Sequence, residues 1–80
     1  MRIMDEVKRE YRNNVQLMRL RAGISKQKEL ANRTGIRAST LSEIESNRVF
    51  LSSAYALRIA EILRCKIDDL FEKRPHGEGQ

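Results

Sequence analysis

The sequence predicts an all-α domain, a compact bundle of five helices, and three observations carry this prediction. Apolar residues recur at steps of three and four along most of the chain, which is the period of an amphipathic helix. Gly23 and Gly35 each stand just past the end of such a run, where a glycine closes a helix. Only a short turn separates the second run from the third, which suits two short helices that cross steeply.

The first predicted helix carries one apolar face and ends at Gly23. Its face is formed by Val7, Tyr11, Val15, Met18 and Ala22. We expect residues 1–13 to be an N-terminal extension of this helix, or to pack on a partner. Residues 14–71 would form the folded domain.

The second predicted helix runs from about Gln27 to Thr34 and the third from about Ala38 to Glu45. Leu41 and Ile44 would face the core of the bundle. This leaves small polar side chains on the opposite face of the third helix, and they are Ser39, Ser42, Glu43 and Ser46. Short side chains let a helix sit deep in a major groove, where base edges can be read.

A fourth helix is predicted to begin after a cap at Ser52 or Ser53 and to end near Leu63. It is apolar on nearly all sides, so we expect it at the buried centre of the bundle. A short fifth element carries Ile67, Leu70 and Phe71. Residues 72–80 are expected to be a flexible tail.

The net charge of +5 lies in residues 1–50, because residues 51–80 hold equal numbers of cations and anions. A basic excess favours a polyanionic partner, and nucleic acid before a membrane. Cys65 and His76 are the only residues of their types, so neither an intramolecular disulfide nor a zinc site can form. No apolar run could span a membrane, and the N-terminus lacks the core of a signal peptide. We therefore expect a cytoplasmic protein without a cofactor or metal.

An enzyme is excluded by the residue inventory. The single histidine lies in the predicted tail, and no recognisable motif positions a base beside any serine. The chain also lacks a glycine-rich loop that could cradle a phosphate.

Three motifs at fixed spacing then point to a known family. They are Gln27-Lys28-Glu29-Leu30-Ala31, Gly35-Ile36 and Ser39-Thr40-Leu41-Ser42-Glu43-Ile44-Glu45. From about Asn14 to Phe71 the sequence resembles the Cro-like, or XRE, family of helix-turn-helix transcriptional regulators. The resemblance implies a Cro/lambda-repressor-like bundle, a homodimer and a palindromic operator on double-stranded DNA.

The sequence departs from this family pattern at four places. One extra residue lies between Gly23 and Gln27, so the first turn is expected to be remodelled. Arg37 stands where the family has a Ser or Thr cap, and Ala38 where an Arg often follows. Arg64 replaces a Gly. An arginine at the entry to the third helix could reach either a phosphate or a guanine.

The predicted DNA contacts fall into two sets. Base-reading candidates at the entry and on the exposed face of the third helix are Arg37, Ala38, Ser39 and Glu43. Phosphate-binding candidates, among them the glutamine that binds phosphate in the resembling family, are Gln27, Lys26, Lys28, Thr40, Ser42, Asn47 and Arg48. Glu43 could accept from a cytosine amino group or could instead pair with Arg37 or Arg48.

Arg19 and Glu45 resemble a structural pair of the family that links the first helix to the end of the third. Glu45 lies at the edge of the inward face and therefore needs a partner. The pair would orient the third helix without touching DNA.

Two functions remain open. The first is a sequence-specific DNA-binding transcriptional regulator, a repressor or an autoregulator. The alternative is a helix-turn-helix module used for protein binding, such as an antitoxin or adaptor, because the exposed face of the third helix is weakly basic with Glu43 at its centre.

Overall fold

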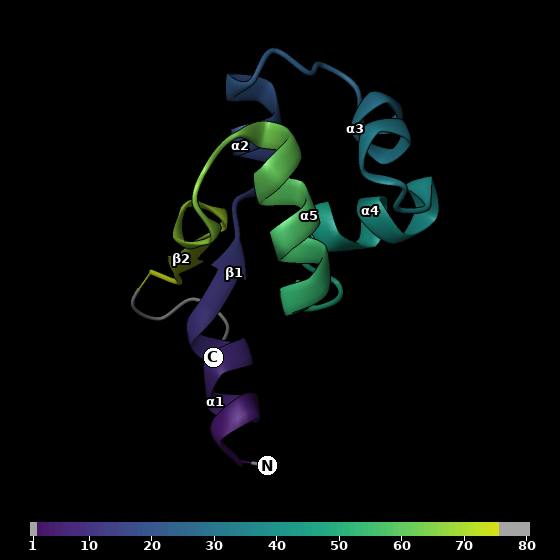
Figure 1. Cartoon of the computed structure of the whole chain (residues 1–80). Coiled ribbons are helices and arrows are strands. Elements are labelled where there is room, and N and C mark those ends of the chain that lie inside the picture. The colour runs from purple at the N-terminus through teal and green to yellow at the C-terminus, as the bar shows by residue number, and fades with distance from the viewer. Residues whose placement is uncertain (1, 76–80) are drawn as a thin grey trace.

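The computed structural model describes residues 2–75 (Figure 1). The elements follow in the order α1 (Arg2–Glu10), β1 (Tyr11–Asn13), α2 (Val15–Arg21), α3 (Gln27–Thr34), α4 (Ala38–Glu45), α5 (Ser53–Leu63), the 3-10 helix η1 (Ile67–Leu70) and β2 (Phe71–Lys73). The predicted bounds of the second and third helices are those of α3 and α4. Helix α5 begins after Ser52, whose hydroxyl accepts from the Tyr55 N–H at 3.3 Å, as a cap should.

The prediction of one continuous first helix is wrong, because β1 divides it into α1 and α2. The division falls at two consecutive asparagines, a residue type that prefers caps and turns to helix interiors. The Asn13 side-chain oxygen accepts from the Val15 N–H at 3.0 Å and so starts α2. Residues 2–10 are therefore a separate helix, which extends away from the body of the molecule (Figure 1).

A two-stranded antiparallel sheet joins the segment after α1 to the segment after η1, so the fold is mostly helical but not all-α. Residues 11, 12 and 13 of β1 face residues 73, 72 and 71 of β2. Arg12 and Glu72 form a cross-strand ion pair at 2.6 Å. Glu72 and Lys73, which were predicted to belong to a tail, thus lie in a strand, whereas His76 lies outside the described residues.

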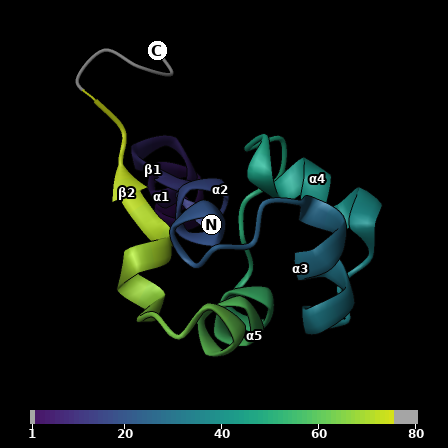
Figure 2. The ribbon, with the colours of Figure 1, turned by 90° about the horizontal axis from the view of Figure 1, so that it is seen from above.

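The buried apolar residues come from every element between β1 and β2. They are Val15, Ile24, Leu30, Ala31, Ile36, Leu41, Ile44, Leu51, Ala56, Ile59, Ala60, Leu63 and Leu70. Viewed from above, α3 and α4 lie on one side of the molecule and the sheet on the other, with α5 between α3 and η1 (Figure 2). Leu41 and Ile44 face inward as predicted.

Helix α5 is not buried on nearly all sides, contrary to the prediction. Its inner face contacts α2, α3 and η1. Its outer face leaves the Leu57 side chain exposed, at 58%, and Tyr55 at 39%. The apolar composition of α5 therefore exceeds what its buried face requires.

Cys65 packs partly buried against the core. Burial raises the pKa of the Cys65 thiol, and the carboxylate of Asp69 raises it further. A thiol whose pKa is raised holds less of the reactive thiolate at neutral pH.

Helix α5 ends in a left-handed residue, which explains why the resembling family has glycine there. Arg64 has φ 55° and ψ 46°, a conformation that costs a residue with a Cβ about 1–2 kcal/mol. The chain turns at this residue, and the Cys65 N–H then donates to the Ala60 carbonyl at 3.0 Å.

We expect Arg64→Gly to raise the free energy of unfolding by about 0.5–1 kcal/mol. The strain of the left-handed backbone is relieved, and part of that gain is offset by the greater freedom of glycine in the unfolded chain. Urea denaturation measures the difference. Arg64→Ala is the control, since it removes the same side chain but keeps the Cβ, and it should give no stabilisation. Equal stability of the two variants would contradict the explanation.

Candidate DNA interface

The two helices of the predicted helix-turn-helix are joined by a tight turn at Gly35. This glycine has φ 79°, and its N–H donates to the Ala31 carbonyl at 2.9 Å. The Thr34 hydroxyl donates to the Leu30 carbonyl at 2.8 Å and accepts from the Ile36 N–H at 3.2 Å. These bonds fix the direction in which the chain leaves α3 and enters α4.

The outer face of α4 is exposed and polar. Leu41 and Ile44 are 0% and 1% exposed, so the opposite side of the helix is turned to solvent. The residues exposed on α4 and at its end are Ala38, Ser39, Ser42, Glu43 and Ser46, while Thr40 is half-buried. The structure thus brings these predicted contact residues together on one short helix.

The side chain of Glu43 makes no ion pair within residues 2–75, so pairing with Arg37 or Arg48 is not seen. Its backbone carbonyl accepts from the Arg48 N–H at 3.0 Å and the Ser46 hydroxyl at 3.1 Å. The carboxylate at the centre of the exposed face is therefore available to a partner.

Helices α3 and α4 both begin without a side-chain cap. Lys26 and Arg37 occupy the N-cap positions, and neither side chain accepts a bond from the first turn. The amide groups of these two helix starts therefore add to the positive charge of the exposed cations beside them. Anions are favoured at such a place.

A buried ion pair holds α4 against α2. The Arg19 Nε donates to Glu45 Oε2 at 2.9 Å and its Nη2 to Oε1 at 3.1 Å, a two-point contact. The two residues are 4% and 8% exposed. Arg19 Nη1 also donates to the Ile24 carbonyl at 2.9 Å. The same guanidinium thus anchors the longer turn between α2 and α3.

The Gln27 side chain, a phosphate-binding candidate in the sequence, joins this pair in the structure. Its Nε2 donates to Glu45 Oε1 at 2.9 Å, and the residue is half-buried. The amide shares this oxygen with Arg19 Nη2, since a carboxylate oxygen can accept two hydrogen bonds. Glu45 is therefore held from both α2 and α3, and Gln27 acts in the structure as a link between helices.

Asn47 likewise turns inward, toward a residue that sequence reasoning missed. Its Oδ1 accepts from both the backbone N–H and the side-chain Nδ2 of Asn13, each at 3.0 Å. Asn13 Nδ2 also donates to the Ile44 carbonyl at 2.7 Å. Asn13 is 7% exposed and so fastens β1 to the end of α4. The signal in the sequence was the asparagine pair inside an otherwise helical pattern.

Cations flank the exposed face of α4. Lys26 and Lys28 lie at the start of α3, Arg37 at the start of α4 and Arg48 in the loop after it, and all four are exposed. Arg37 thus stands at the start of α4 and Arg48 just past its end, and the bond from Gln27 to Glu45 places the start of α3 near that end as well. A family model described as "Helix-turn-helix" matches residues 15–70.

The chain belongs to the XRE family of helix-turn-helix proteins. It is therefore a DNA-binding helix-turn-helix regulator, of a class that is not typically enzymatic. No curated protein matches it significantly. The match to the XRE family runs from the first residue of α2 to the last residue of η1. Helix α1 and both strands lie outside it.

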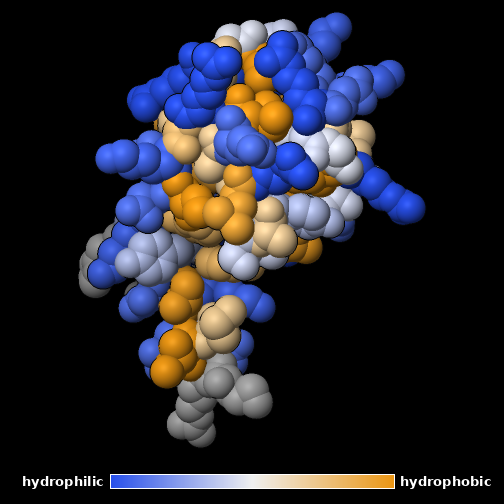
Figure 3. Space-filling view, viewed as in Figure 1, coloured by the Kyte–Doolittle hydropathy of each residue, from blue (hydrophilic) through white to orange (hydrophobic). Residues whose placement is uncertain are grey.

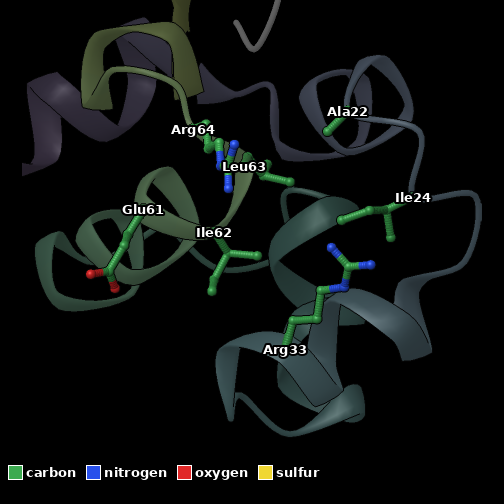
Figure 4. A pocket seen from close by; sticks show the side chains of 7 residues that line it. All are labelled: Ala22, Ile24, Arg33, Glu61, Ile62, Leu63 and Arg64. Atoms are coloured by element: carbon green, nitrogen blue, oxygen red, sulfur yellow. The ribbon is translucent and has the colours of Figure 1, made fainter.

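A hollow of this XRE-family protein lies between α2, α3 and α5 (Figure 4). Its charged lining residues are Arg33, Glu61 and Arg64, and its other lining residues are apolar. Arg33 is paired with Glu29 at 2.8 Å.

No helix within residues 2–75 is both long and apolar enough to cross a membrane.

Proposed function

We propose that this XRE-family regulator binds a palindromic operator as a homodimer and acts as a repressor or autoregulator. The observation that carries the proposal is the exposed polar face of α4, held in place by Arg19, Gln27 and Glu45 and flanked by cations. A rigid helix with short side chains can enter a major groove, and flanking cations bind the phosphates on either side.

The proposal assigns two roles to the exposed residues. Ser39 and Glu43, one helical turn apart at the centre of the face, read bases together with Arg37 and Ala38 at the helix entry. The backbone is bound by Lys26, Lys28, Thr40, Ser42 and Arg48. Gln27 and Asn47 position these groups, because their side chains are engaged inside the protein.

Substitutions of the base-reading residues and of the phosphate-binding residues should affect DNA binding in different ways. Lys28→Ala and Arg48→Ala should weaken specific and non-specific DNA alike, and each should flatten the log–log salt dependence of binding by about one. Ser39→Ala and Glu43→Gln should leave that slope nearly unchanged and alter base preference by roughly 1–3 kcal/mol at one or two positions of a half-site.

Selection from randomised half-sites, combined with binding titrations over a range of salt, measures both effects. Arg58→Ala is the matched control, since Arg58 lies on the outer side of α5 in an exposed pair with Glu61. If the Ser39 and Glu43 variants select the sequence of the parent, α4 does not read bases through them and Arg37 becomes the leading candidate.

We expect the protein to be a dimer at micromolar concentration, because the single small core and the two-fold habit of the family favour one. Two apolar surfaces could form the contact. Ile3 and Met4 are 73% and 54% exposed on α1, and Leu57 and Ile67 are 58% and 38% exposed in the C-terminal half. Figure 3 shows hydrophobic side chains on the segment that protrudes from the body of the molecule.

Sedimentation equilibrium, with and without DNA, tests this state. Ile3→Ser with Met4→Ser should give a monomer if α1 forms the contact, and Leu57→Ser with Ile67→Ser if the C-terminal half does. A parent protein that sediments only as a monomer under both conditions would refute the dimer.

A second candidate function is protein binding by the same fold. The free carboxylate of Glu43 at the centre of the α4 face favours it, since this charge repels phosphate. A gel shift against the promoter of the protein's own gene, at several salt concentrations, separates the two candidates. Sequence-selective retention that survives competitor DNA supports the regulator, and no retention at low salt supports protein binding.

A further inference from the structure

A groove lies between α1, the loop after α4 and the end of β2. It encloses about 190 Å3, and its lining includes Lys8, Tyr11, Arg48, Phe50 and Arg74. Three of its described lining side chains are therefore cations from three separate segments, and none of the lining residues within 2–75 carries a carboxylate. A concave surface lined by charges of one sign concentrates its field and attracts the opposite charge.

The groove is built on fixed backbone. The Arg74 N–H donates to the Glu10 carbonyl at 2.7 Å, which joins the end of β2 to the end of α1. The rings of Phe50 and Phe71 stack with centroids 5.7 Å apart and hold the loop against β2. Asn47 is held by Asn13. The three cations are thus brought together by the fold.

The groove continues the proposed DNA face. Arg48 lies three residues after the last residue of α4, and its N–H bonds to the Glu43 carbonyl at 3.0 Å. Arg48 therefore lies beside the exposed face of α4 and also lines the groove. Lys8 and Arg74 lie outside residues 15–70, the segment that matches the family model.

We propose that this groove binds backbone phosphates of double-stranded DNA beside the bases that α4 faces. Lys8 and Arg74 then extend the contact beyond the part of the chain shared with the family. The proposal rests on the proposed function, since it requires α4 to be docked on DNA. Its ligand is the phosphodiester backbone, so it adds affinity and register but no base preference.

Fluorescence anisotropy with a labelled duplex of random sequence, several helical turns long, tests the proposal. Lys8→Gln should flatten the log–log salt slope by about 0.9, and Lys8→Gln with Arg74→Gln by about twice that amount. Arg64→Gln with Lys66→Gln is the matched control, because it removes the same charge beyond the far end of α5 and should leave the slope unchanged. Thermal melting followed by circular dichroism establishes that each variant is folded.

The outcomes distinguish this proposal from the one on which it rests. If Lys28→Gln flattens the slope and the groove variants do not, the groove is not a phosphate site while DNA binding stands. If the control pair flattens the slope as much as the groove pair, only net charge matters and the groove proposal is overturned. If the parent binds no duplex at the lowest salt, both proposals fall. Should the double variant unfold, Lys8→Gln alone decides, since Lys8 is an exposed side chain on α1.

Discussion

Replacing Arg19 with alanine should lower the free energy of unfolding by about 3–5 kcal/mol. The substitution leaves the Glu45 carboxylate buried without its two-point partner, which is far more costly than the loss of an exposed pair. It also removes the bond to the Ile24 carbonyl. A domain of this size has a total stability of roughly 4–12 kcal/mol, so the variant should be close to unfolding at room temperature.

Arg58→Ala is the control for this effect, because Arg58 also pairs with a glutamate but its side chain is 57% exposed. Exposed pairs contribute roughly 0–1 kcal/mol, so this variant should melt near the parent. Thermal and urea denaturation of both variants give the comparison. Equal midpoints for Arg19→Ala and Arg58→Ala would show that the buried pair does not stabilise the domain.

Replacing Asn13 with alanine should lower the free energy of unfolding by about 2–4 kcal/mol. The Val15 N–H would lose its partner in a buried setting, and such a loss costs about 1–3 kcal/mol. The Ile44 carbonyl would lose the shorter of two bonds and keep the one from the Asn47 N–H. Asn47 would lose one of the two bonds that its side chain accepts, and it has φ 60°, a conformation that needs support.

The chain offers a matched control for Asn13 in Asn32, an exposed asparagine within α3. Asn32→Ala should be neutral or stabilising by a few tenths of a kcal/mol, because alanine is the better helix former. Urea denaturation gives both differences, and the m-value should not change. A loss in Asn13→Ala no larger than the change in Asn32→Ala would mean that the hydrogen bonds of Asn13 are replaced by water at little cost.

The central part of the fold could be predicted because its signals are local. Gly35 closes α3 with a positive φ, and the spacing of Leu41 and Ile44 determines which side of α4 is buried. Both features lie within a few residues of the structure that they determine. The ends of α3 and α4 therefore agree with the sequence prediction.

The sheet could not be predicted, because its strands lie 60 residues apart and have only three residues each. Such short strands show no alternation of apolar and polar residues over several positions. Val7, Tyr11 and Val15 also keep a helical spacing across the break. The decisive group was Asn13, whose partners, residues 44 and 47, are distant in sequence.

The sequence predicts which side chains of α4 are exposed, but it does not predict which polar side chains of the candidate site bond to other parts of the protein. Exposed side chains of α4 follow from the helical period, whereas the partner of a polar side chain depends on tertiary packing. The amides of Gln27 and Asn47 can bond a phosphate or a protein group equally well, and the structure engages both inside the protein. Arg19 and Glu45, 26 residues apart, were paired only through the resemblance to the family.

The distance between the two strands also has a consequence for synthesis on the ribosome. β1 is made early, but its partner strand follows about sixty residues later, so β1 waits unpaired while α2–α5 are translated. Asn47 is made well before β2, only 34 residues after Asn13. The bonds between the two asparagines can therefore form first and hold β1 in place. The two strands of the nascent chain would then pair last, after the bonds between Asn13 and Asn47 have already positioned β1.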